Sequence, residues 1–326
     1  MQFPLNIYCL SAIGAGLASA LGVRFWRNWC ERIGLVDEPG HRKIHAQPMP
    51  LAGGLAIWTA LAVTSIAALA VLNVGWLDDE TTQKLLFGLS RRRGQLIALF
   101  FGATGMTLLG VLDDKYELRP ALKFTGQLII AVWAAAAGIR ITLFVPSLAF
   151  SYLITILWIL TVTNAFNFMD NMNGLCAGLG LIAAGLLGLT AALHGQYLVA
   201  AICFLICGAL LGFLPFNFPR AKAFLGDSGS HLIGFLLAVL AILPHFYTRE
   251  RPHHWVVLSP LLILAVPLAD LAWVVGLRWR LNQPFYVGDT NHLSHRLLRR
   301  GFSSTQAVSL IWLLAAAIGS LALLWG

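Results

Sequence analysis

Long apolar stretches alternate with short polar connections along the whole chain. A helix of roughly 17 to 25 apolar residues crosses a hydrocarbon layer about 30 Å thick. On this basis the pattern predicts an all-α polytopic integral membrane protein, folded as one domain over residues 1–326. The ten predicted segments, two of them shorter than ideal, lie at about 4–26, 52–77, 95–112, 123–138, 147–164, 174–193, 196–214, 230–246, 255–277 and 306–325.

Composition supports the same fold class. Hydrophobic residues make up 58% of the chain and charged residues 11%, with a mean hydropathy of +0.77, which is more apolar than a soluble domain tolerates. The first apolar run lacks a basic leader and continues into Arg24 and Arg27, so we interpret it as an anchor and not as a cleaved signal. The five cysteines have no CxxC spacing, and we expect neither a disulfide framework nor a zinc site.

An even number of crossings places both chain ends on one side of the membrane. The connections near 27–51, 113–122, 165–173, 215–229 and 278–305 then lie together on the other side, called here the motif side. Most of the 22 lysine and arginine residues fall there, so the positive-inside rule predicts that the motif side is cytoplasmic, although Arg91, Arg92 and Arg93 lie opposite. The net charge of +8 indicates anionic lipid headgroups as partners, and not nucleic acid.

Two acidic motifs lie on the motif side. Asp113 and Asp114 follow an apolar run, and Asp227 lies in a glycine-bracketed turn before another one. Mg²⁺ relieves the repulsion between neighbouring carboxylates and typically binds one or two of them together with substrate phosphates. In the second motif, glycines also let backbone N–H groups approach an anion. The alternatives are a solvated helix end for the Asp pair and an ordinary Asp or Ser N-cap for the turn.

A polar segment between these motifs contains Asn164, Asn167, Asp170 and Asn171 at positions i, i+3, i+6 and i+7. In helical geometry these side chains share roughly one face. Carboxamides and carboxylates of this kind suit recognition of a nucleobase, a ribose or a sugar hydroxyl. Hydrogen bonding between packed helices is the alternative interpretation.

Cationic residues occupy the first and last motif-side connections. Taken alone, each set is more typical of a solvated, lipid-facing basic loop, and each could bind phosphate. Phosphate binding is favoured over zinc ligation because no third ligand has zinc spacing. The cationic residues are Arg42, Lys43 and His45 in the first connection, and His292, His295 and Arg296 in the last. Asp270 is the acidic residue inside a predicted membrane segment, where a carboxylate is expected to be functional. Lys115, Ser228 and His231 adjoin the acidic motifs.

Taken together and in order, the motifs resemble the polyprenyl-phosphate N-acetylhexosamine-1-phosphate transferases of glycosyltransferase family 4, which include the phospho-MurNAc-pentapeptide transferase. The similarity covers most of the chain, at residues 34–56, 110–127, 164–175, 217–230 and 292–306. The resemblance implies Mg²⁺-dependent (or Mn²⁺-dependent) transfer of a sugar-1-phosphate from a UDP-sugar to a polyprenyl phosphate. UMP would be released at the cytoplasmic face of a bacterial inner membrane, with a homodimer as a further expectation.

The resemblance also implies roles for individual residues. Asp113, Asp114 and Asp227 match the family's acidic catalytic positions, and Asp227 with Asp114 would hold the metal. The other carried-over positions are Asn164, Asn167, Asp170 and Asn171 for the nucleotide and sugar, and Lys123, His292, His295 and Arg296 for phosphate, with Lys115, Ser228 and Asp270 as further candidates.

The chain departs from the family pattern at three positions. Asn171 stands where the family commonly has Gly, Asn173 where it has Asp, and Ser294 where it has a third His. The HxxHR form indicates the GlcNAc-type branch that initiates cell-envelope glycans such as teichoic acid or lipopolysaccharide, with peptidoglycan precursor synthesis as the alternative. A transporter or flippase, and a different membrane phosphotransferase or intramembrane hydrolase using the Asp pair, are the rivals from other classes.

Overall fold

The computed structural model describes residues 3–38, 47–74, 76–143, 145–244, 254–284 and 290–325. Within them the chain is almost entirely helical, with one small antiparallel hairpin. The elements are α1 (Leu5–Ile33), β1 (Val36–Asp37), β2 (Met49–Pro50), α2 (Gly53–Val74), α3 (Asp79–Arg91), α4 (Arg93–Tyr116), α5 (Pro120–Ala136), α6 (Leu148–Phe168), α7 (Leu175–Leu193), α8 (Tyr197–Asn217), α9 (Gly226–Leu240), η1 (His254–Leu258), α10 (Ser259–Ile263), α11 (Ala265–Arg280), α12 (Leu293–Arg299), α13 (Ser304–Ser320) and η2 (Leu321–Trp325).

Seven helices of the described chain are long and apolar enough to cross a membrane: α1, α2, α4, α6, α7, α8 and the α13 segment Ser304–Leu324. The segment Val256–Ile263 and α11 together would form an eighth crossing, but they meet at an angle of 68°. α5 and α9 are apolar but shorter, at 17 and 15 residues. The prediction of a helical polytopic membrane protein is therefore confirmed. Each of the ten predicted segments contains one of these elements, but ten full crossings stay a prediction.

Two local differences from the sequence-based expectation have clear causes. The predicted segment 255–277 is not one straight helix, because the chain bends by 68° at Leu264, between α10 and α11. The predicted connection after residue 77 contains a helix, α3, whose start is capped by Asp78 accepting a hydrogen bond from the Thr81 N–H at 2.8 Å. A capped amphipathic helix of this kind carries no long apolar run, so a hydropathy criterion does not detect it.

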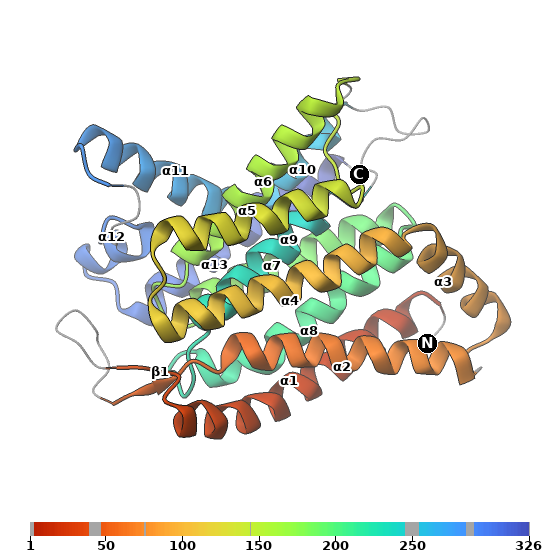
Figure 1. The fold of residues 1–326 in the computed structure, drawn as a ribbon, viewed down its shortest axis with the longest axis horizontal. Coiled ribbons are helices and arrows are strands. Elements are labelled where there is room, and N and C mark those ends of the chain that lie inside the picture. The colour runs from red at the N-terminus through yellow and green to blue at the C-terminus, as the bar shows by residue number, and fades with distance from the viewer. Residues whose placement is uncertain are drawn as a thin grey trace.

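The helix α9 is the centre of the bundle. It packs against α2, α4, α6 and α7, and every one of its residues except Asp227 is buried. α1 packs along α8 and α2 on one side of the molecule. Both chain ends lie towards one end of the bundle, whereas the hairpin and α12 lie at the other, as an even number of crossings requires (Figure 1). The first turn of α9 thus places Asp227 at the motif side, whereas the rest of the helix is buried in the bundle.

Glycines allow α4 and α2 to approach the first turn of α9 closely. A Cβ at Gly110 or Gly54 would overlap backbone atoms of Ser228 or Gly229. Both glycines therefore set the distance between the acidic turn and its neighbours.

We expect Gly110→Ala to destabilise the protein by about 1–3 kcal/mol, because forced overpacking of a close backbone contact cannot relax without moving α9. The measurement is the midpoint of thermal unfolding in detergent. Gly94→Ala on the same helix is the matched control, since a Cβ there meets nothing within 4 Å. Equal midpoints for the two variants would contradict this account of the packing.

Candidate active site

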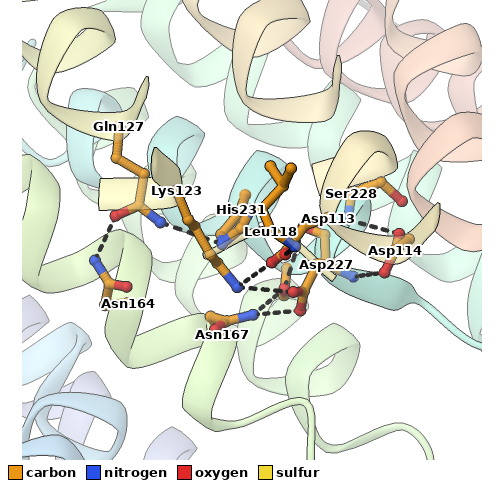
Figure 2. A network of polar contacts seen from close by, with 11 residues as sticks. Asp113, Asp114, Leu118, Lys123, Gln127, Asn164, Asn167, Asp227, Ser228 and His231 are labelled. Carbon is orange, nitrogen blue, oxygen red and sulfur yellow. Dashed lines mark hydrogen bonds and ion pairs between the residues drawn. The ribbon is translucent and has the colours of Figure 1, made fainter. Parts of the chain in front are cut away.

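Four helix ends converge at the motif side and bring together residues that are far apart in the chain. The last turn of α4 supplies Asp113 and Asp114, the first turn of α5 supplies Lys123, the last turn of α6 supplies Asn167 and the first turn of α9 supplies Asp227 (Figure 2). The local cause is the same in each helix, because an apolar run ends and the first polar residues follow it. Their convergence depends on the packing of α4, α5 and α6 around α9.

The Lys123 ammonium lies between two carboxylates. Its Nζ is 2.6 Å from Asp113 Oδ2 and 2.7 Å from Asp227 Oδ2. The side chain of Asp113 is 9% exposed, that of Lys123 20% and that of Asp227 31%, so Asp227 is the most accessible of the three. Charge-assisted hydrogen bonds of this length hold the two carboxylates and the ammonium close together.

Asn167 joins the same cluster. Its Nδ2 donates to Asp227 Oδ1 at 2.7 Å and to Ser230 Oγ at 3.0 Å. Both oxygens of Asp227 therefore have a donor, one from α5 and one from α6. The orientation of this carboxylate is fixed by two neighbouring helices before any ligand arrives.

Asp114 faces α9 and acts as its cap. Its two oxygens accept hydrogen bonds from the backbone N–H groups of Asp227 at 2.8 Å and Ser228 at 3.1 Å. No side chain of the glycine-bracketed turn caps α9, so the Asp or Ser N-cap is not observed. The backbone N–H groups of the turn do bind an anion, which is the carboxylate of Asp114. Gly226 has φ +74°, and a Cβ there would lie 2.7 Å from Asp114 Oδ2, so only glycine permits this approach.

A second polar layer lies one helical turn deeper. Asn164 Nδ2 donates to Gln127 Oε1 at 2.8 Å, and Gln127 Nε2 is 3.2 Å from His231 Nε2 (Figure 2). Sequence reasoning missed Gln127 entirely. The signal was available, since Gln127 follows Lys123 and His231 follows Asp227 by one helical turn of four residues. Asn164 joins α6 to α5 through this bond, as the alternative of hydrogen bonding between packed helices expects, and its contact with a nucleotide stays a prediction.

Asp170 lies in the turn between α6 and α7, just beyond the end of α6. Burial raises the pKa of its carboxyl well above the usual range, and the negative charges of Asp227 and Asp114 raise it further, whereas a hydrogen bond from the Gly226 backbone N–H opposes the shift. Asp170 therefore belongs electrostatically to the acidic cluster. The predicted shared face holds only in part, because α6 ends at Phe168.

Asn171 connects this turn to the last motif. Its Oδ1 accepts a hydrogen bond from Ser294 Oγ at 2.7 Å, and its Nδ2 donates to the Phe168 carbonyl at 2.7 Å. Two of the three positions that depart from the family pattern thus contact each other. Nothing in the sequence pattern indicated that they were neighbours.

The cationic residues of the last motif are held by α11. His292 Nδ1 is 2.7 Å from Asp270 Oδ2, and the Arg296 guanidinium lies 4.6 Å from the centre of the Trp273 ring. The rings of His292 and His295 are 6.4 Å apart. Asp270 is thereby connected to the predicted phosphate-binding residues and not to the carboxylates of the first cluster.

The remaining candidate residues do not place their side chains in the acidic cluster or lie outside the described chain. Lys115 Nζ donates to the carbonyl oxygens of Ile33 at 2.5 Å and Gly34 at 3.2 Å, so it caps the end of α1. The Ser228 side chain is fully buried, and its contact with the acidic cluster is the backbone N–H. Arg42, Lys43 and His45 lie outside the described residues.

A large cavity elsewhere does not coincide with this site. It has a volume of about 1280 Å³, lies at the opposite end of the helices and is lined by residues that include Arg92, Trp158 and Tyr197. No carboxylate is among its described lining residues. The acidic cluster at the motif side, and not this cavity, carries the chemistry that the sequence motifs indicate.

Known proteins with this sequence pattern identify the family. The profile of glycosyl transferase family 4 matches residues 96–245. A Bacillus subtilis (strain 168) protein named as a probable undecaprenyl-phosphate N-acetylglucosaminyl 1-phosphate transferase is 32% identical over 291 residues, which span 87% of this chain and 75% of that protein. The chain belongs to glycosyl transferase family 4.

Two further relatives of this family 4 protein extend the similarity over nearly the whole chain. A decaprenyl-phosphate N-acetylglucosaminephosphotransferase of Mycobacterium tuberculosis (strain CDC 1551 / Oshkosh) is 32% identical over 95% of this chain and 80% of its own length. An undecaprenyl-phosphate alpha-N-acetylglucosaminyl 1-phosphate transferase of Escherichia coli O157:H7 is 28% identical over 98% of this chain and 85% of its own length. The match therefore includes the last motif as well as the acidic cluster.

The donor set of the family 4 protein fits a magnesium ion. Within the described chain no three His, Cys, Asp or Glu side chains are grouped closely enough to hold a metal by themselves. Mg²⁺, however, commonly takes one or two carboxylates and completes its octahedron with water and substrate phosphates. Asp113 and Asp227 already share one cation, the Lys123 ammonium, and both donors to Asp227 are side chains, whereas both oxygens of Asp114 accept from backbone N–H groups at the start of α9. Asp227 and Asp113 are therefore the better pair for a divalent ion.

Proposed function

We propose that this family 4 protein transfers N-acetylglucosamine-1-phosphate from UDP-GlcNAc to undecaprenyl phosphate or a similar polyprenyl phosphate, with release of UMP. The observation that carries the proposal is the convergence of Asp113, Lys123, Asn167 and Asp227 from four helices onto one charged cluster. The names of the B. subtilis, M. tuberculosis and E. coli relatives support the sugar and the lipid acceptor. The product would be a polyprenyl-diphosphate-linked sugar that initiates a cell-envelope glycan.

The cluster suits phosphoryl transfer because this reaction needs positioning and charge neutralisation more than a strong covalent partner. A Mg²⁺ ion held by Asp227 and Asp113 would neutralise charge on the diphosphate of the donor. Lys123, already between the two carboxylates, would contact the same phosphates, and His292 with Arg296 would bind them from α12. A lipid phosphate monoester has a second pKa near 6, so it is largely dianionic at pH 7 and requires little help from a base.

The proposed location is a bacterial inner membrane, with the site open to the cytoplasm. The motif side contains most of the basic residues, as the positive-inside rule expects of a cytoplasmic face. Nucleotide sugars are water-soluble cytoplasmic metabolites, and the acceptor phosphate lies at the membrane surface. A site at the helix ends serves both substrates.

A reconstitution assay tests the proposal. Purified protein in detergent, given UDP-GlcNAc, Mg²⁺ and undecaprenyl phosphate, is expected to release UMP and to form a lipid-linked GlcNAc phosphate detectable by mass spectrometry. No UMP should form without the lipid. Other UDP-sugars, including UDP-MurNAc-pentapeptide, supplied in parallel should be used less well. Absence of UMP with every sugar, in a folded preparation, would contradict the proposal and favour the transport alternative.

A further inference from the structure

Asp270 is a charged residue on an otherwise apolar part of α11. Its side chain is 2% exposed, and the surrounding sequence, AVPLADLAWVV, contains no other polar group. A buried carboxylate costs several kcal/mol of solvation unless it is paired and hydrogen-bonded. Its partners should therefore explain why it is there.

Both oxygens of Asp270 contact the start of α12. Oδ2 is 2.7 Å from His292 Nδ1, and Oδ1 accepts a hydrogen bond from the Leu293 backbone N–H at 2.6 Å. The His292 side chain is itself only 7% exposed. Since Leu293 is the first residue of α12, one carboxylate holds the imidazole ring and caps the helix that carries His295 and Arg296.

This contact selects the form of the imidazole. A carboxylate accepts, so the proton of the shared hydrogen bond is on Nδ1. Nε2, on the other side of the ring, has no hydrogen-bond partner among the described residues. A ring that donates through Nδ1 also has an Nε2–H to donate to a phosphate oxygen when it is an imidazolium.

Two other contacts hold α12 without Asp270. Ser294 Oγ donates to Asn171 Oδ1 at 2.7 Å, and Arg296 lies over the Trp273 ring. Loss of the Asp270 charge should therefore leave α12 attached to the α6–α7 turn and to α11. The main consequence falls on the protonation and orientation of His292.

We propose that Asp270 is a positioning residue that holds the ring of His292 through Nδ1, so that His292 as an imidazolium presents its Nε2–H to a phosphate oxygen of the substrate diphosphate. Asp270 itself touches neither substrate nor the reacting atoms, because it acts through the ring of His292. The inference rests on the proposed function in that it assigns His292 a phosphate of the donor sugar nucleotide. It adds a carboxylate to the site that is distinct from the metal-binding pair.

The first test is Asp270→Asn, which keeps the side-chain shape and an amide oxygen that can still accept from the Leu293 N–H. It removes the negative charge that faces the ring, and an amide NH2 group next to Nδ1 favours a neutral ring whose one proton is on Nε2, so the positive charge of the imidazolium is lost. We expect kcat to fall by at least about tenfold, with the KM for UDP-GlcNAc changed by less than about threefold, because the lost interaction is needed mainly in the transition state. If Asp270 were only a helix cap, kcat would stay within about twofold of the unsubstituted protein.

The second test is a double-substitution cycle with His292→Gln. If Asp270 acts through His292, the double variant should be no slower than His292→Gln alone. Effects that multiply would overturn the proposal. Thr190→Val is the matched control for loss of a buried polar group in a helix of the bundle, because the Thr190 hydroxyl bonds only the Leu186 carbonyl of its own helix.

A measurement on the unsubstituted protein covers the case in which Asp270→Asn does not fold. In ¹⁵N-histidine-labelled protein, the His292 resonances, assigned by their loss in His292→Gln, should show protons on both Nδ1 and Nε2. A missing proton on either nitrogen would overturn the proposal. Failure of the unsubstituted protein to release UMP would reject the proposed function itself, whereas an active protein with a near-normal Asp270→Asn rate rejects only the role of Asp270.

Discussion

Asp227→Asn is expected to lower the turnover of UDP-GlcNAc by on the order of a thousandfold, the effect of losing a group that stabilises transition-state charge. Asp227 is the most exposed acid of the cluster and receives Lys123 on one oxygen and Asn167 on the other. The amide keeps the size of the side chain but removes the charge that would hold a divalent cation and that now orients Lys123. The measurement is UMP release under saturating substrates over a range of Mg²⁺ concentrations.

The matched control is Asp79→Asn, which makes the same substitution at an exposed acid in the first turn of α3, at the opposite end of the helices. Its turnover should be unchanged. Near-normal transfer by Asp227→Asn at saturating Mg²⁺ would refute the metal-binding role of Asp227. A residual rate that rises with Mg²⁺ but stays far below that of the unsubstituted protein would agree with a weakened metal site.

The second large effect is expected from Lys123→Met. Removal of the ammonium leaves the Asp113 and Asp227 carboxylates, both within 2.7 Å of it, to repel each other in a partly buried place. Breaking a buried charged pair costs about 3–5 kcal/mol, and the partial exposure of Lys123 reduces this cost to about 2 kcal/mol. We expect a lower unfolding midpoint without Mg²⁺, and a larger rise on adding Mg²⁺ than in the unsubstituted protein, because the ion replaces the missing cation.

Turnover of Lys123→Met should also fall by about a hundredfold, since a cation next to the transferred phosphate is lost. Lys84→Met is the control, because Lys84 pairs with Glu80 at the surface at the other end of the molecule, where exposed pairs contribute about 0–1 kcal/mol. Identical Mg²⁺-induced shifts in Lys123→Met and the unsubstituted protein would show that the two carboxylates do not bind the ion. That outcome would leave the fold and the family assignment intact.

Sequence patterns located only part of the cluster that the tertiary structure brings together (Figure 2). Asp113, Asp227 and Asn167 were identified because each ends or begins an apolar run, which is a local property. Gln127 was missed because it lies inside such a run, where a single amide resembles an ordinary packing residue. Asp114 was expected to hold the metal with Asp227, but adjacent residues on a helix point in different directions, and Asp114 turns towards the first turn of α9.

The fold shows the same difference between what local sequence patterns predict and what depends on tertiary packing. Hydropathy located the apolar elements because the cost of placing polar backbone and side chains in hydrocarbon acts on each segment separately. It did not reveal the bend of 68° before α11, or that α9 has only 15 residues and lies at the centre of the bundle. A helix of 15 residues can lie in the middle of the bundle only because α2, α4, α6 and α7 surround it, which is a property of the assembly.

The sequence by itself determined the class of the protein, a helical membrane protein whose acidic and basic motifs all fall on one side, because burial of apolar runs and the alternation of crossings follow from chain order alone. Only the tertiary structure decided which polar groups meet. Lys123 between Asp113 and Asp227, Asp114 on the start of α9, and Asp270 on His292 are contacts between residues up to 114 positions apart. Such pairs depend on the distance and rotation between packed helices. These are set by residues at the helix contacts, such as Gly54, Gly110 and Gly226, and not by any local pattern.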